Sequence, residues 1–189
     1  MAEEAGQIRT GDELDADARA LRQLALAQIR QYPDPALRMK ANEVTEFDAS
    51  LQQLVARMAS LMTDARGVGL AATQVGILQR LFVFSPGEEE EVRAVVNPEL
   101  AERSNEADVD DEGCLSLQGV LVPVERSVRV TLVGKDEHGD DVRFELDGMS
   151  ARVVQHEVDH LDGVLIVDKT TDDARRGAMA TLRAQLMIA

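Results

Sequence analysis

The run QHEVDHLDG, residues 155–163, holds two histidines four positions apart with a glutamate directly after the first. Because an α-helix advances 3.6 residues per turn, His156 and His160 would project from one helical face and reach the same metal ion. Glu157 would lie about one hundred degrees around the helix from His156, where a carboxylate can take a proton from water without being a ligand. The spacing predicts a hydrolytic metal site.

Two histidines at this spacing can also merely pack or hydrogen-bond on a polar helix. A pair of that kind is expected on a solvated face, whereas His156 and His160 adjoin Met149 and Val153 on the helical wheel. These apolar neighbours favour metal ligands on a largely buried helix.

A catalytic site of this type uses three protein ligands and leaves one coordination position to water. No histidine follows His160, and the acids beyond it are Asp162, Asp168, Asp172 and Asp173. Cys114 is the better candidate, because DEGCLSLQG is predicted as a glycine-containing turn between strands, from which a thiolate can meet the helix. A lone cysteine is more often a small buried residue, and it is the histidine pair that favours ligation here.

Hydrophobic periodicity predicts the elements that position these residues. A modest amphipathic helix is expected over 13–30, and a clearer one follows from Asp48 or Ser50 to Gly67, with apolar residues at i, i+3, i+4 and i+7. Strands are expected at 81–84, 94–100, 120–124, 128–134 and 142–146. The histidines lie on a third helix that ends at Gly163, and a C-terminal helix begins at Thr170 or Thr171. We expect an α+β fold in which antiparallel β-sheets pack around the histidine-bearing helix, with N-terminal and C-terminal helices.

Composition narrows the class of protein. The length of 189 residues suits one domain, and the net charge of -15 argues against binding to DNA through phosphate neutralisation. No segment approaches the roughly 20 apolar residues that span a bilayer, and the first residues lack the pattern of a signal peptide. We therefore expect a cytoplasmic protein with no membrane partner. The single cysteine excludes an intrachain disulfide.

Three segments together resemble the peptide deformylase family: GVGLAATQ at 67–74, EGCLS at 112–116 and QHEVDHLDG at 155–163. The similarity runs from about Ile29, through QYPDPALR, to about Leu165. It implies an N-terminal extension at 1–28, a metal-dependent catalytic domain at 29–167 and a C-terminal helical tail at 168–189.

The resemblance implies hydrolysis of the N-formyl group from the N-terminal formylmethionine of nascent polypeptides. It implies that Cys114, His156 and His160 bind one divalent metal ion, with Fe(II) expected and zinc, nickel or cobalt as substitutes. It also implies that Glu157 transfers protons.

Further contacts to the substrate follow from the same resemblance. Gln74, the backbone of Leu115 and the region of Gly69 are implied to contact the formyl group and the peptide. Apolar groups near the histidines, with Val68 and Val153 as candidates, are expected to receive the methionine side chain.

The chain departs from the family pattern at two positions. Gln118 stands where a proline is common, and Val124 follows Val122 and Pro123 where an arginine is frequent. We expect both departures to affect the rim of the substrate site rather than the metal.

Two other functions compete with this interpretation. A zinc endopeptidase uses the same histidine motif, and a non-catalytic binding module would keep the metal as a structural element. Structural sites are usually closed by four protein ligands, and no fourth ligand is evident in the sequence. Arginines 175, 176 and 183 allow docking of the C-terminal helix on a ribosome, although a solvated or core-packed helix is the simpler interpretation.

Overall fold

The computed structural model describes residues 3–5, 8–10, 16–87 and 91–187. Its four α-helices in this part of the chain are α1 (Ala16–Leu26), α2 (Ala49–Asp64), α3 (Gly148–Leu161) and α4 (Asp172–Leu186). Three short 3-10 helices connect them: η1 (Pro35–Arg38), η2 (Ala72–Val75) and η3 (Ile166–Asp168). None of the described helices is both long enough and apolar enough to traverse a bilayer.

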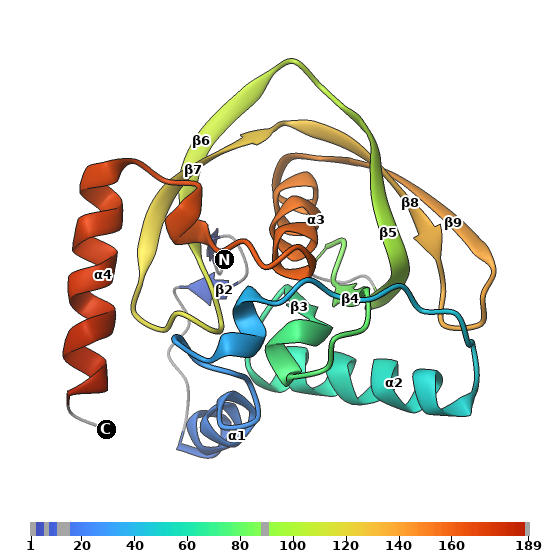
Figure 1. Ribbon diagram of the computed structural model, residues 1–189, viewed down its shortest axis with the longest axis horizontal. Coiled ribbons are helices and arrows are strands. Elements are labelled where there is room, and N and C mark those ends of the chain that lie inside the picture. The colour runs from blue at the N-terminus through green and yellow to red at the C-terminus, as the bar shows by residue number, and fades with distance from the viewer. Residues whose placement is uncertain (1–2, 6–7, 11–15, 88–90, 188–189) are drawn as a thin grey trace.

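The strands of the described residues form three antiparallel sheets. Strands β3 (Gly69–Ala71), β4 (Leu81–Phe84), β5 (Arg93–Arg103), β8 (Arg129–Lys135) and β9 (Asp141–Asp147) make a five-stranded sheet in that order. Strand β6 (Ala107–Gly113) pairs with β7 (Leu121–Ser127), and β1 (Glu3–Ala5) pairs with β2 (Ile8–Thr10). In Figure 1, α3 stands inside an arch formed by β6 and β7 on one side and by β5, β8 and β9 on the other.

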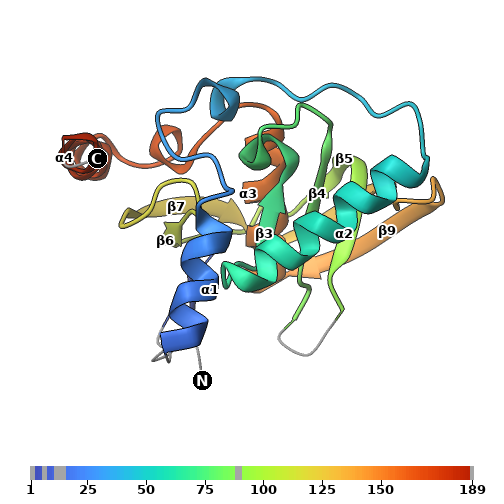
Figure 2. The same ribbon diagram turned by 90° about the horizontal axis from the view of Figure 1, so that it is seen from below.

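Alternation along β4 explains why helices cover both faces of the large sheet. Successive strand residues point to opposite faces, so Leu81 and Val83 pack in the cluster that contains α2, while Phe82 and Phe84 pack in the cluster that contains α3. All four are fully buried. Figure 2 shows α2 crossing the sheet on the side away from α3. The expected α+β fold with antiparallel sheets around the histidine-bearing helix is confirmed.

Local signals set the helix boundaries. The Asp48 carboxylate accepts hydrogen bonds from the N–H groups of Ser50 and Leu51 at 3.0 and 3.1 Å, which caps α2 as expected. After α3, Gly163 takes a φ of +73°, and a β-carbon built there would lie 2.6 Å from the carbonyl oxygen of Arg38. The glycine is thus required both by its backbone conformation and by the close approach of the chain.

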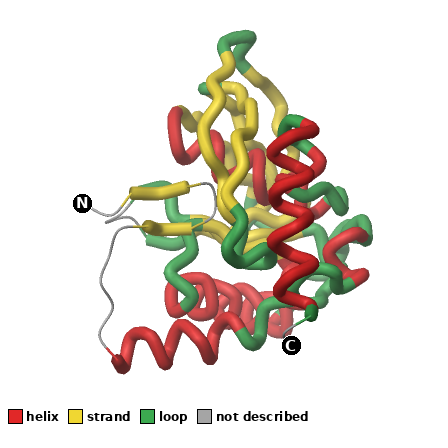
Figure 3. The backbone as a smooth tube through the Cα atoms, turned by 90° about the vertical axis from the view of Figure 1, so that its left-hand side faces the viewer, coloured by secondary structure: helices red, strands yellow, loops and turns green. Residues whose placement is uncertain are grey.

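The terminal helices occupy different places. Helix α1 packs on α2 and contributes Ala25 and Leu26 to the core. Helix α4 begins after a Thr171 cap and lies on the outside of the molecule, in front of the strands in Figure 3. Its Ala178 and Leu182 pack in a cluster with residues of β7 and η3. Its arginines are exposed.

Candidate active site

Three buried donor atoms converge where the end of β6 meets α3. Cys114 follows β6 directly, and its sulfur lies 3.3 Å from Nε2 of His160. The Nε2 atoms of His156 and His160 are 3.1 Å apart, and the sulfur and both rings offer ligand atoms within 4.8 Å of one another. The structure therefore brings together the three predicted ligands from segments 46 residues apart in sequence.

The donor set fits a divalent metal ion. Sulfur and imidazole nitrogen atoms bound tetrahedrally to one ion at about 2.0–2.3 Å lie roughly 3.4–3.6 Å from each other. The two His160 separations given above, 3.1 and 3.3 Å, are close to this value. Burial, with the neighbouring His156, holds the pKa of His160 well below its ordinary value, so its ring is neutral and has a lone pair to donate. Burial also raises the pKa of the Cys114 thiol, so a cation is needed to keep its sulfur ionised.

Glu112 orients the first histidine. Its Oε2 accepts a hydrogen bond from Nδ1 of His156 at 2.9 Å, which leaves the Nε2 lone pair of that ring pointing to the site. Burial alone would raise the pKa of Glu112, but the hydrogen bonds from His156 and Arg126 outweigh it and hold the carboxyl ionised.

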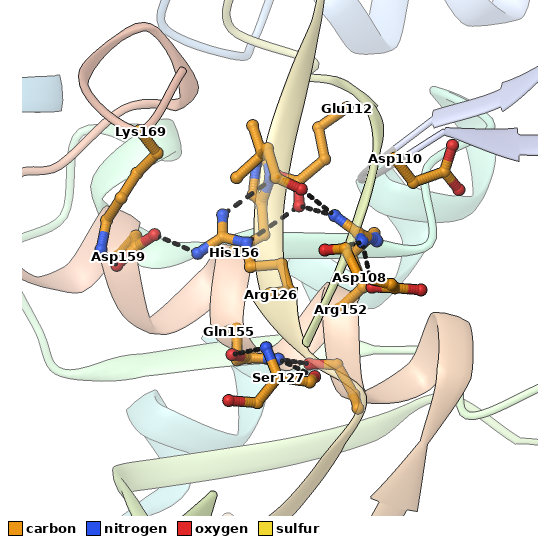
Figure 4. A network of polar contacts seen from close by, with 12 residues as sticks. Asp108, Asp110, Glu112, Arg126, Ser127, Arg152, Gln155, His156, Asp159 and Lys169 are labelled. Atoms are coloured by element: carbon orange, nitrogen blue, oxygen red, sulfur yellow. Dashed lines mark hydrogen bonds and ion pairs between the residues drawn. The ribbon is translucent and has the colours of Figure 1, made fainter. Parts of the chain in front are cut away.

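Two arginines surround this fully buried carboxylate (Figure 4). Arg126 donates to both oxygens of Glu112 at 2.9 and 3.0 Å and also to Asp159 on α3. Arg152 donates to Glu112 at 2.9 Å and to the carbonyl oxygen of Val124 at 2.8 Å. The network joins both strands of the small sheet to the helix that carries the histidines.

Glu112, Arg126 and Arg152 were assigned no role from the sequence. A signal for Glu112 was its place only two residues before Cys114, at the end of β6. An acid this close in sequence to a candidate ligand cysteine is a candidate partner for a ligand histidine. Nothing in the local pattern marks Arg126 and Arg152 as its counterions.

Glu157 is fully buried, and its carboxylate lies against the backbone of β3. A β-carbon built at Gly69 would lie 2.2 Å from Oε1 of Glu157 and 2.8 Å from its Cδ, too close for any side chain. The glycine predicted to approach the substrate thus makes room for the carboxylate predicted to move protons.

Gln74 is held beside the sulfur. Its Oε1 accepts from the N–H of Ala71 at 2.9 Å, so its amide nitrogen faces Ser116 Oγ at 3.0 Å and Cys114 Sγ at 3.7 Å. Leu115, next to Cys114, is buried. Both predicted oxyanion donors therefore lie beside the candidate metal ligands.

The other residues singled out from the sequence are three buried valines and one exposed glutamine. Val68 and Val153 are buried in the same hydrophobic cluster around α3. Val124 is fully buried on the inner face of β7, and its effect on the substrate rim stays a prediction. Gln118 is exposed.

Known proteins match this sequence and fold. A family model described as polypeptide deformylase matches residues 26–176. The peptide deformylase of Thermotoga maritima is 45% identical over 160 residues, which are 85% of this chain and 94% of that protein. The peptide deformylase of Thermodesulfovibrio yellowstonii is 42% identical over 149 residues, which are 77% of this chain and 90% of that protein.

Solved structures of peptide deformylases have a similar fold. The crystal structure of a peptide deformylase from Legionella pneumophila has 38% sequence identity and a TM-score of 0.79 over 85% of this chain and 95% of that chain. The crystal structure from Thermotoga maritima has 47% identity and a TM-score of 0.73 over 76% of this chain and 96% of that chain. The family match over residues 26–176 and these relatives show that the chain belongs to the polypeptide deformylase family of hydrolases.

Proposed function

We propose that this chain hydrolyses the N-formyl group from the N-terminal formylmethionine of nascent polypeptides and that the reaction depends on a divalent metal. The observation that carries the proposal is the convergence of Cys114, His156 and His160, all buried, with ligand atoms within 4.8 Å of one another. Three protein ligands are the number typical of a catalytic site that keeps one position open.

A cation held by these three residues would supply Lewis acidity and lower the pKa of a water molecule. Glu157 accepts the proton from that water as the water oxygen forms a bond to the formyl carbon. Glu157 then delivers the proton to the amine nitrogen while the carbon–nitrogen bond breaks. Formate and a peptide with a free amino terminus leave.

Gln74 and Leu115 stabilise the charge that develops on the formyl oxygen. The amide nitrogen of Gln74 faces Cys114 from a position fixed by the Ala71 N–H, and the N–H of Leu115 follows the same sulfur ligand in the chain. Donors that are already oriented cost no reorganisation when the oxygen becomes negative.

We further propose that Val68 and Val153 contact the methionine side chain and that the backbone at Gly69 contacts the peptide. The support is position: both valines belong to the hydrophobic cluster around α3, and Gly69 adjoins Glu157. A methionine side chain needs an apolar environment of this kind.

Fe(II) is the proposed ion, with zinc, nickel and cobalt as substitutes, since two imidazoles and a thiolate suit each of them. Protein purified without oxygen and analysed for metal tests this choice. Iron predicts high activity that is lost in air, because an iron–thiolate site oxidises, whereas equal activity with zinc would contradict it.

The proposed catalytic unit is 29–167, with an extension at 1–28 and a helical tail at 168–189. The enzyme would act in the cytoplasm, where formylated chains are made, and the exposed arginines of α4 suggest docking on the ribosome. Two of them also have local partners, since Arg176 pairs with Asp173 and Arg175 lies 3.8 Å from Asp168. Co-sedimentation with ribosomes of the full chain and of a chain without α4 tests the docking.

The decisive assay compares two substrates. Release of formate from a formylmethionyl peptide, with no cleavage of internal peptide bonds, supports the proposal. Cleavage of internal bonds would support a zinc endopeptidase, and metal binding without turnover of either substrate would support a structural metal.

A further inference from the structure

A short segment at 29–32 joins the two loops that carry the proposed oxyanion donors. The N–H of Arg30 donates to the carbonyl oxygen of Gln74 at 2.7 Å, and the N–H of Tyr32 donates to the carbonyl oxygen of Ser116 at 2.9 Å. Between these two anchors lies Gln31. Its backbone is therefore fixed relative to both loops.

The side chain of Gln31 reaches the peptide that follows the sulfur ligand. Its Nε2 donates to the carbonyl oxygen of Leu115 at 3.0 Å. The N–H of Ser116 in the same peptide group donates to Cys114 Sγ at 3.4 Å. Because a peptide group is planar, a hydrogen bond that holds its oxygen also fixes the direction of its N–H. The bond to oxygen further polarises the amide and strengthens the N–H as a donor.

Gln118 contributes to the orientation of the Gln31 amide, whose Nε2 also donates to the carbonyl oxygen of Ile29 at 3.1 Å. Nε2 of Gln118 donates to Oε1 of Gln31 at 3.0 Å, so the nitrogen of Gln31 faces Leu115. The turn that carries Gln118 is in turn held by α4, since Nε2 of Gln185 donates to the Gln118 carbonyl oxygen at 2.9 Å. A proline at position 118 would offer no side-chain donor to Gln31.

We propose that Gln31 is a positioning residue for the sulfur of Cys114, acting through the Leu115–Ser116 peptide, with Gln118 contributing to its orientation. The hydrogen bond from the Ser116 N–H withdraws charge from the sulfur and holds it toward the two histidines. The proposal rests on the proposed role of Cys114 as a metal ligand and adds residues that act on that ligand.

Cobalt-loaded protein gives a readout that needs no substrate. A thiolate bound to Co(II) produces a sulfur-to-metal charge-transfer band whose energy falls when the sulfur loses a hydrogen bond. Gln31→Met removes the donor at similar length, and Gln31→Glu removes it while it keeps an acceptor for Gln118. We expect both variants to shift the band to longer wavelength and to lose cobalt to a chelator about 3- to 10-fold more readily, less than the loss typical of direct partners of ligands.

Two further variants complete the comparison. Gln118→Ala removes one of the contacts that orient the Gln31 amide and leaves its bonds to Leu115 and Ile29, so it should shift the band in the same direction by less. Gln53→Glu makes the same charge change on the exposed face of α2 and should leave the spectrum unchanged. With a formylated peptide, the Gln31 variants should lower kcat and leave KM unchanged.

The outcomes separate this proposal from the proposed function. If the wild type shows the thiolate–cobalt band and the Gln31 variants match it in band energy and in chelator competition, the proposed role of Gln31 is wrong. The proposed function is then unaffected. If kcat/KM falls because KM rises, and the band is unchanged, Gln31 contacts the substrate. That result would also contradict the proposed positioning role. A wild-type protein without a thiolate–cobalt band would overturn both proposals.

Discussion

Glu157 is buried between α3 and the backbone of Gly69, where its carboxylate has no access to bulk solvent. Replacing Glu157 by Ala should slow turnover by at least about 10², because the attacking water loses its proton acceptor. Metal content should remain that of the wild type, since the three ligands are untouched. Formate release together with metal analysis checks this, and a near-normal rate would show that another group moves the proton.

A substitution at Gly69 perturbs the Glu157 carboxylate from the backbone of β3. Gly69→Ala places a methyl group 2.2 Å from Oε1 of Glu157, so the carboxylate or strand β3 must move. We expect kcat to fall toward that of the Glu157 variant while metal remains bound. Wild-type kcat in this variant would show that the carboxylate position matters little.

Gly177→Ala is the matched control for that substitution. Gly177 lies in α4, and a β-carbon built there would have no neighbouring atom within 4 Å outside the local helix backbone. Alanine in a helix is favoured over glycine by roughly 0.5–1 kcal/mol, so this variant should be slightly more stable and fully active.

Single residues were predictable from sequence where spacing alone decides geometry. Two histidines at i and i+4 must share a helical face, and Cys114 was the only thiol available to join them. Glu112 and its two arginines were not assigned, because their partnership depends on how β6, β7 and α3 meet. Contacts of that kind are absent from any local pattern.

At the scale of elements, β7 presents alternate residues to the buried side of the small sheet. Val122, Val124 and Arg126 are buried, whereas the residues between them are more exposed. Arg126→Met would leave Glu112 with Arg152 as its remaining arginine partner, so the cost should be below the roughly 3–5 kcal/mol of a buried charge left without any partner. We expect a lower urea midpoint and weaker metal binding, because Glu112 also holds His156.

Adding Val124→Arg to the Arg126→Met variant tests whether the guanidinium or its position matters. Position 124 faces the same side of β7, two residues along the strand. A guanidinium there should restore part of the lost stability and metal affinity. If the double variant is no more stable than the single one and binds metal no more tightly, the guanidinium is effective only at position 126.

The predicted elements differ from the observed ones where apolar patterning is weak. Strands β4, β5, β7, β8 and β9 were expected from their apolar residues, with ends shifted by a few positions. Strand β6 has no apolar pattern that predicts it, because its first five residues are exposed and mostly acidic, and it is defined by its pairing with β7. Strand β3 spans three residues and resembles a loop in sequence.

At the scale of the whole molecule, an ion pair joins segments far apart in the chain near the end of α3. Asp168 in η3 pairs with Arg38 in η1 and accepts from the N–H of Leu165 at 2.8 Å. Burial would raise the pKa of Asp168, but these hydrogen bonds outweigh it, so the pKa falls below its ordinary value of 3.8. The ionised carboxylate therefore stabilises the folded protein.

The pH dependence follows from that direction. A carboxyl whose pKa is lower in the folded state contributes fully above the unfolded pKa, and the contribution is lost as pH falls through the folded pKa. Asp168→Asn should lower Tm at pH 7, and the difference from wild type should shrink as the pH falls below about 3.8. Thermal unfolding at a series of pH values measures this, and a constant difference would contradict it.

The α+β class and the central helix were predictable because alternating strands and one helix with apolar residues on more than one side require that arrangement. The strand order was not, since β5 pairs with β8 across the whole β6–β7 excursion. Long-range pairing depends on the assembled core rather than on either strand alone.

The inward alternation of β7 also bears on how relatives of this enzyme are compared. Position 124, directly after Val122 and Pro123, holds a valine rather than an arginine. The guanidinium that meets the Glu112 carboxylate comes from position 126, two residues downstream on the same face of β7. A sequence search for this ion pair should therefore accept an arginine at either inward position of the strand. A pattern restricted to position 124 would miss chains, such as this one, in which position 126 supplies the guanidinium.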